Sequence, residues 1–239
     1  VLRLAGLGPP KGGRSGRGVF GEYDPLLGWR HRAGASGEFR DGDLKFHVAL
    51  NSRGLRDAEH AGARTPGRPR ALVLGDSFAW GFGVEQPATF SDLLEKAIPG
   101  AEIVNAGVCG YGTDQEFLWL REKGMAYAPD VVLLVLCGND PFLDKARIAY
   151  GIYGKPAFVP GEGKARKPEN VPVPPTPWRK RFLFHLRQSS ALASLADRIV
   201  RQAKRSRGAT DAGGAARPFE VTLRILENMR DLCRAKGVR

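Results

Sequence analysis

Three short motifs place small and polar residues directly after apolar runs of the chain. Gly75-Asp76-Ser77 follows the run Ala71–Leu74, and Gly138-Asn139-Asp140 follows the run Val131–Leu136. Between them lies the segment Asn105–Gly110. A serine hydroxyl can attack an ester carbonyl, while backbone N–H groups and an asparagine amide can stabilise the oxyanion that then develops. The motifs therefore contain the residue types that acyl transfer requires.

Each motif also has an ordinary structural interpretation. Asp76 and Ser77 are residue types that often cap a following helix. Gly110 and Asn139 are both common in turns. Taken singly, Gly110 and Asn139 are better interpreted as turn residues, and the two interpretations of Ser77 are level. The order of the three motifs, each after an apolar run, favours the catalytic interpretation.

The elements around the motifs alternate between apolar runs and amphipathic segments. Apolar residues at helical spacing predict helices over 89–98 and 113–124, between strands over 71–75, 102–105 and 131–136. Such alternation is typical of α/β proteins, and the unbroken apolar run at 131–136 predicts a strand that is buried on both faces of a parallel sheet. The carboxyl ends of parallel strands meet at one edge. We therefore expect the three motifs to converge in a crevice at that edge.

The remaining chain is predicted to be less regular. Residues 1–20 are rich in Gly, Pro and Arg, which predicts a flexible linker before a single domain over 21–239. Within that domain, residues 151–216 are interpreted as an insertion of loop, basic helix and spacer. The other expected elements are an irregular segment over 21–56 with an edge strand near 46–50, a polar loop over 57–70, a short helix over 141–150, a basic helix over 178–204 and an amphipathic helix over 219–235.

The positive charge of the chain is concentrated in one segment. The 239 residues carry a net charge of +12, and residues 164–207 contain twelve Lys and Arg against the two acids Glu169 and Asp197. No nucleic-acid-binding motif accompanies this charge, so we expect no nucleic-acid partner. A solvated helix that packs on the core is the preferred interpretation of 178–204, and contact with a membrane surface comes second. A lid over the Ser77 crevice is a third alternative.

Several other functional signatures are missing from the sequence. Ala79 stands where a Gly-x-Ser-x-Gly elbow has its last glycine, and no phosphate-binding loop or metal-ligand spacing is present. We therefore expect no metal and no cofactor. Cys109, Cys137 and Cys233 are too few and too irregular for a disulfide framework. No apolar run is long enough to cross a membrane, but the chain begins at Val1, so cytoplasmic and membrane-anchored extracytoplasmic locations both stay open.

Taken together, the three motifs resemble those of the SGNH (GDSL-type) hydrolase superfamily, over about residues 21–145. The resemblance implies a flavodoxin-like, doubly wound three-layer sandwich around a parallel sheet. It implies that Ser77 is the nucleophile and that Ser77, Gly110 and Asn139 form the oxyanion hole. The implied substrates are small-acyl, lipid or glycan esters, as for an esterase, a lipase or a carbohydrate O-acetylesterase. A non-catalytic binding module and an acyltransferase at a membrane surface are the alternatives.

The general base is where the sequence departs from the family pattern. The family carries Asp-x-x-His after a further strand, and no such motif follows Ser77. Asp57 and His60 have this spacing, but they precede Ser77 in a polar loop, so we interpret the match as chance. The other histidines, which are interpreted as structural or solvated, are His31, His47 and His185. The base and the last strand are therefore expected beyond Arg239, and these 239 residues alone are expected to be nearly inactive.

Overall fold

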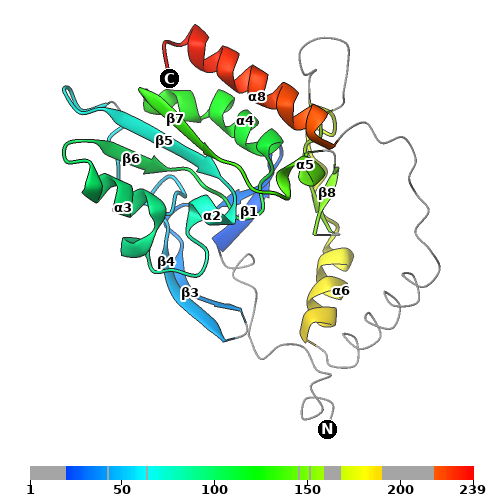
Figure 1. Cartoon of the computed structure of the whole chain (residues 1–239). Coiled ribbons are helices and arrows are strands. Elements are labelled where there is room, and N and C mark those ends of the chain that lie inside the picture. Colours follow the sequence, from blue (N-terminus) through cyan, green and yellow to red (C-terminus); the bar gives the residue numbers. More distant parts are fainter. Residues whose placement is uncertain are drawn as a thin grey trace.

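A computed structural model of the chain describes residues 20–41, 43–62, 64–144, 146–150, 152–158, 168–189 and 218–239. They form an α/β protein in which helices flank a three-stranded parallel sheet (Figure 1). The strands are β5 (Arg70–Gly75), β6 (Glu102–Asn105) and β7 (Val131–Val135), in the spatial order β6-β5-β7. The predicted parallel sheet is confirmed, with strand ends within one residue of those expected.

The central strand β5 is covered by helices on both of its faces. Leu72 and Leu74 are buried in a cluster with side chains of α4 (Thr113–Glu122) and α8 (Pro218–Ala235). Val73 points to the opposite face, where Leu94 of α3 (Phe90–Ala97) packs against its cluster. Successive side chains of a strand point to opposite faces, so an uninterrupted apolar sequence is what two covered faces require. The three amphipathic helices predicted near these positions are confirmed.

The strand β7 is less buried than the sequence predicted. Its five residues are half-buried rather than buried, because β7 lies at the edge of the described sheet. Arg239 pairs with the start of this edge: its N–H donates to the Asp130 carbonyl (2.9 Å), and its own carbonyl accepts the Val132 N–H (2.8 Å). The chain after α8 therefore comes alongside β7 in the manner of a parallel strand.

The segment before β5 is more regular than predicted. It forms two antiparallel hairpins, β1 (Gly21–Asp24) with β2 (Gly28–His31) and β3 (Ser36–Asp41) with β4 (Leu44–Ala49). The prediction of an irregular segment was wrong, although the expected edge strand near 46–50 corresponds to β4. Residues of β1 and β2 are mostly half-buried or exposed, so these strands lack the alternating apolar pattern that would reveal them.

The predicted helix over 141–150 is also wrong in its extent. The helix α5 ends after one turn (Asp140–Leu143), and a small antiparallel pair follows, β8 (Ile148–Ala149) with β9 (Tyr153–Gly154). Tyr150 has a left-handed backbone (φ 53°), which a right-handed helix cannot contain.

The basic helix is described in part. The helix α6 covers Trp178–Ser189, while the rest of the predicted helix, to residue 204, lies outside the described residues. The spacer and residues 1–19 of the linker predicted over 1–20 also lie outside them, whereas Phe20 is described and is buried in a core cluster. The short helices are α2 (Ser77–Trp80), η1 (Gln86–Ala88) and η2 (Gly124–Tyr127). Within the part of the chain that the structure describes, no helix combines the length and apolarity that a membrane span needs.

Candidate active site

Ser77 is the first residue of α2, directly after β5. The cap of this helix is Asp76, whose side chain accepts a hydrogen bond from the Phe78 N–H (2.9 Å). Ser77 is half-buried, and Gly81 ends the helix in a left-handed conformation (φ 85°). The sequence allowed either Asp76 or Ser77 to cap this helix, and the structure shows that Asp76 does so. The Ser77 hydroxyl is not needed for it.

Gly110 lies in the loop that continues β6 past the end of the sheet. The Val108 N–H donates to the Gly75 carbonyl (3.0 Å), so this loop runs beside the end of β5. The approach is close at Gly107, where a side-chain Cβ would lie 2.5 Å from the Trp80 nitrogen in α2. Gly110 is buried and has a φ of +80°, a conformation that favours glycine.

The Gly110 loop is fastened from the N-terminal hairpin. The Trp29 indole N–H donates to the Cys109 carbonyl (3.3 Å), and the Tyr111 hydroxyl donates to the Trp29 carbonyl (2.6 Å). The two rings also meet edge to face, with 5.6 Å between their centroids. The residues on both sides of Gly110 are therefore fixed by one tryptophan that precedes the motif by about eighty positions.

Asn139 follows β7 and precedes α5. Its side chain is exposed. Asp140 shapes the turn by accepting the Cys137 N–H (2.7 Å). Gly75 and Val135 are register partners in the parallel sheet, so the residues after β5 and β7 emerge side by side. The parallel register thus brings Ser77, Gly110 and Asn139 to the same edge of the sheet, as the sequence predicted, while their catalytic roles stay predictions.

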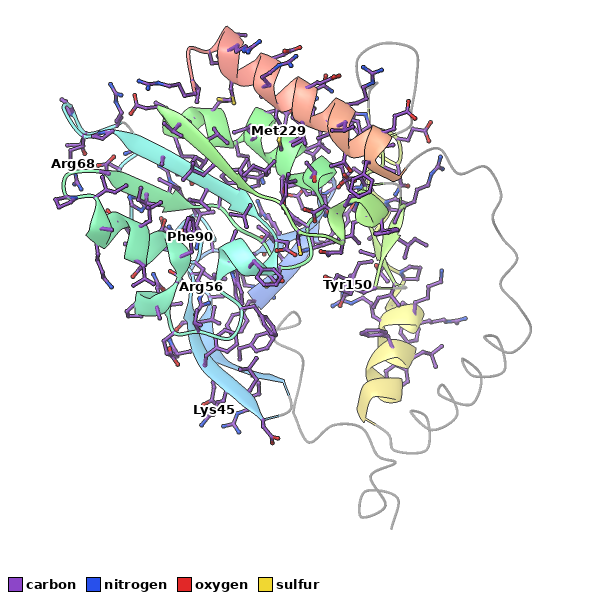
Figure 2. All side chains as sticks on the ribbon, in the orientation of Figure 1. Lys45, Arg56, Arg68, Phe90, Tyr150 and Met229 are labelled. Atoms are coloured by element: carbon purple, nitrogen blue, oxygen red, sulfur yellow. The ribbon has the colours of Figure 1, made fainter. Side chains whose placement is uncertain are left out.

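Arg56 supports the turn after Ser77, a role that the sequence did not reveal. Its guanidinium is buried between β4 and α2 (Figure 2), where it donates to the carbonyls of His47 (3.1 Å), Val84 (2.6 Å), Trp80 (3.3 Å) and Gly81. It also lies over the Trp80 ring, 4.8 Å from the centroid. Trp80 itself is 2% exposed and belongs to the core.

A buried group of carboxylates lies behind the candidate site. This group was not predicted from the sequence, because Asp114 and Glu116 belong to a polar stretch at the start of α4 that looks solvent-exposed. One cation, Lys155, is buried among them and forms an ion pair with Asp114. Among the described residues, no group of His, Cys, Asp and Glu has an arrangement that could hold a metal. The carboxylates are Asp76, Asp114, Glu116, Asp140 and Asp144.

Burial determines the protonation of this group. It raises the pKa of Asp140 to about 6 and that of Asp144 to about 7, with nearby carboxylates adding to both effects. It also raises the pKa of Glu116 well above its ordinary value, and the charges of Asp140 and Asp144 reinforce this. Both Glu116 oxygens lack a hydrogen-bond partner in the described structure. The protonated form of Glu116 is therefore the favoured one.

The described histidines do not supply an evident partner for Ser77. Burial lowers the pKa of His31 to about 4, and its ring packs against Trp80. His47 is exposed, with Nε2 3.3 Å from the Ser36 hydroxyl. Both fit the structural or solvated roles expected of them. The side chain of His185 lies outside the described residues.

Asp57 and His60 do form a hydrogen-bonded pair, with 3.0 Å between Oδ2 and Nε2. Asp57 also accepts the Asn105 N–H (2.7 Å). The chain then runs back to the start of β5, where Arg70 donates to the carbonyls of Ala61 and Gly62. Ser77 follows the opposite end of β5, and no hydrogen bond joins it to His60 in the described part of the chain. The pair fastens this loop to the sheet.

A pH-dependent contribution to stability is expected from this pair. The hydrogen bond to Asp57 raises the pKa of His60 above 6.5. A raised histidine pKa stabilises the fold fully below the unfolded pKa, and this contribution is lost as the pH rises through the folded pKa. His60→Gln is therefore expected to lower the free energy of unfolding more at about pH 5.5 than at about pH 9. Urea denaturation measures this, and equal losses at both pH values would contradict the role of the pair.

Comparison with known proteins identifies the family. A model of the GDSL-like lipase/acylhydrolase family matches residues 73–238, which is more than half of the chain. The chain belongs to this family. The acylhydrolase match begins inside β5 and includes all three motifs, whereas Trp29, Arg56 and both N-terminal hairpins precede it.

Solved structures match parts of the chain at low similarity. The SGNH-hydrolase family esterase AlinE4 is 24% identical and has a TM-score of 0.28, and the match covers 33% of this chain and 45% of AlinE4. TesA is 19% identical and has a TM-score of 0.31, with 71% of this chain and 75% of TesA covered. The chain thus spans less than half the length of AlinE4. No curated protein matches it.

Proposed function

We propose that the chain carries the nucleophile and the oxyanion hole of a serine ester hydrolase. Ser77 would attack the ester carbonyl, and the N–H groups of Ser77 and Gly110 together with the Asn139 amide would stabilise the oxyanion. The observation that carries this proposal is the convergence of the three motifs at one sheet edge, where Val108 bonds to Gly75 and Gly75 is the register partner of Val135.

The finer description of the fold is part of the same proposal. The order β6-β5-β7 with helices on both faces supports the flavodoxin-like, doubly wound sandwich and a single domain from residue 21. The general base is proposed to lie beyond Arg239, since no described histidine side chain is hydrogen-bonded to Ser77. The proposed substrates are small-acyl, lipid or glycan esters. The alternatives are a binding module without catalysis and an acyltransferase at a membrane surface.

A fluorophosphonate probe tests this proposal, because it reacts with an activated serine hydroxyl. The probe is applied to this chain and to the chain extended by whatever its gene encodes after Arg239, and the label is mapped by mass spectrometry. Labelling of Ser77 in the extended chain supports the hydrolase. A folded, extended chain in which Ser77 stays unlabelled supports the binding module instead.

Contact with an anionic membrane surface is proposed for α6. Trp178, Phe182 and Leu183 expose 70%, 60% and 49% of their surfaces, while Phe184 packs on Tyr153 with ring centroids 6.4 Å apart. The basic side chains between them, Arg179, Lys180 and Arg181, are exposed as well and form no ion pair within the described part of the chain. Exposed aromatic residues beside basic ones are typical of helices that lie in a membrane interface.

Co-sedimentation with liposomes checks this contact. The protein is expected to bind vesicles that contain phosphatidylserine more strongly than neutral vesicles. A Trp178→Ala, Phe182→Ala double variant is expected to lose most of this binding, because it removes the apolar anchors. Phe90→Ala, which changes an exposed aromatic residue on α3, serves as the control. Equal and negligible binding to both vesicle types would contradict the proposal.

A further inference from the structure

Tyr150 lies against the glycine that is proposed to hold the oxyanion. A Cβ atom built on Gly110 would be 2.1 Å from the Tyr150 hydroxyl oxygen and 2.7 Å from Cε2 of its ring. The phenol therefore occupies the space that the side chain of any other residue at position 110 would need. A side chain at position 110 would therefore have to displace the phenol, in addition to adopting an unfavourable positive φ.

The backbone of Tyr150 is held in an uncommon conformation to achieve this contact. Its φ of 53° is left-handed, which is rare for an aromatic residue and costs energy that the surroundings must offset. Strained residues of this kind cluster at functional sites. The Tyr150 side chain is also 44% exposed, so it lies between the buried Gly110 and solvent and is not part of the core.

The β8–β9 pair that carries Tyr150 is anchored on both sides. Ala149, directly before Tyr150, is 1% exposed. After β9, Lys155 is fully buried, pairs with Asp114 and donates to the Leu143 carbonyl (2.9 Å). A Cβ on Gly28 would lie 2.1 Å from the Gly154 carbonyl oxygen, so the N-terminal hairpin packs directly against β9. The position of Tyr150 is therefore fixed by the fold.

From this placement we infer that Tyr150 is a specificity-determining residue of the ester site. The inference rests on the proposed function. If the Gly110 N–H binds the oxyanion, the group of the ester that lies beside it is confined by the phenol, and the site accepts small groups better than long ones. Removal of the ring would open this side without moving Gly110, because Trp29 holds Cys109 and Tyr111 independently.

The test compares p-nitrophenyl octanoate with p-nitrophenyl acetate, using whichever length of the protein hydrolyses the acetate ester. Tyr150→Ala is expected to raise the octanoate-to-acetate ratio of kcat/KM by about tenfold, the discrimination that a few methylene groups in an apolar space provide. Tyr150→Phe keeps the ring and is expected to keep the ratio within about twofold. Phe90→Ala, an aromatic residue well apart from Tyr150 in Figure 2, is expected to leave the ratio unchanged.

A double-mutant cycle separates this inference from the proposed function. Gly110→Ala is expected to lower the melting temperature less when Tyr150 is already alanine, since the overlap with the phenol is then gone. If Ser77→Ala leaves the hydrolysis intact, the proposed function fails and the inference fails with it. Two results would overturn the inference alone, provided that hydrolysis depends on Ser77. One is an unchanged octanoate-to-acetate ratio in Tyr150→Ala, and the other is additive effects of Gly110→Ala and Tyr150→Ala on the melting temperature.

Discussion

Alanine in place of Ser77 is expected to lower kcat for the hydrolysis of p-nitrophenyl acetate by a factor of about 10⁴ to 10⁶. The reason is that the proposed mechanism forms a covalent acyl intermediate on the Ser77 oxygen, which alanine lacks. The helix that follows should persist, because Asp76 and not Ser77 provides its cap. The measurement is steady-state hydrolysis at neutral pH, with circular dichroism to verify that the variant is folded.

The length of chain used for this measurement matters. In the described part of the chain no histidine side chain is hydrogen-bonded to Ser77, so hydrolysis by the 239 residues alone is expected to be slow. The comparison is therefore made both on this chain and on the chain extended by its downstream sequence. Robust hydrolysis by the 239 residues that is lost in Ser77→Ala would contradict the proposed position of the base. It would point to a base within these residues, with His60 the first to replace.

Replacing Lys155 by methionine is expected to lower the free energy of unfolding by roughly 3–5 kcal/mol at neutral pH. Lys155 and Asp114 are both fully buried and form an ion pair. Removing the Lys155 ammonium leaves the negative charge of Asp114 buried without a cation, in a group that also contains Glu116 and Asp144. The Lys155 ammonium also donates to the Leu143 carbonyl (2.9 Å), which would lose this partner. Urea denaturation measures the loss.

A second variant shows whether the buried charge is the cause. Asp114→Asn combined with Lys155→Met removes both members of the pair, and it is expected to recover at least half of the lost stability. Lys96→Met is the control, because Lys96 is 60% exposed and its nearest Asp92 oxygen is 4.0 Å away. A surface pair of this kind contributes less than about 1 kcal/mol. Strictly additive losses from Asp114→Asn and Lys155→Met would show that the pair is not coupled.

The sequence predicted those parts of the molecule that depend on local pattern. Both faces of β5 are covered, so no polar residue interrupts the apolar run before Ser77. This unbroken run is the pattern that predicts a buried strand. The spacing of apolar residues in α8 likewise follows from one buried face. The convergence of the three motifs needed no further information, because strands in a parallel sheet end at the same edge.

The parts that could not be predicted depend on contacts between distant segments. Arg56 looks like one more basic residue in a polar loop, and only the approach of β4 and α2 gives its guanidinium four carbonyl partners. Tyr150 was expected in a helix, and its place over Gly110 depends on β8–β9, a pair too short to show a period. The burial of Glu116 depends on α5 and α8 packing against α4.

The fastening of the Gly110 loop by Trp29 also bears on how the molecule folds. The two partners of that hydrogen bond are 80 residues apart, and the Gln115 side chain bonds to the Leu27 carbonyl across 88 residues. Closing long loops costs chain entropy before any contact compensates for it, and folding slows as contacts become less local. An isolated two-stranded hairpin is only marginally stable. During synthesis, the hairpin that carries Trp29 is made before the Gly110 loop that it holds. It therefore gains its stability only after the later strands have formed.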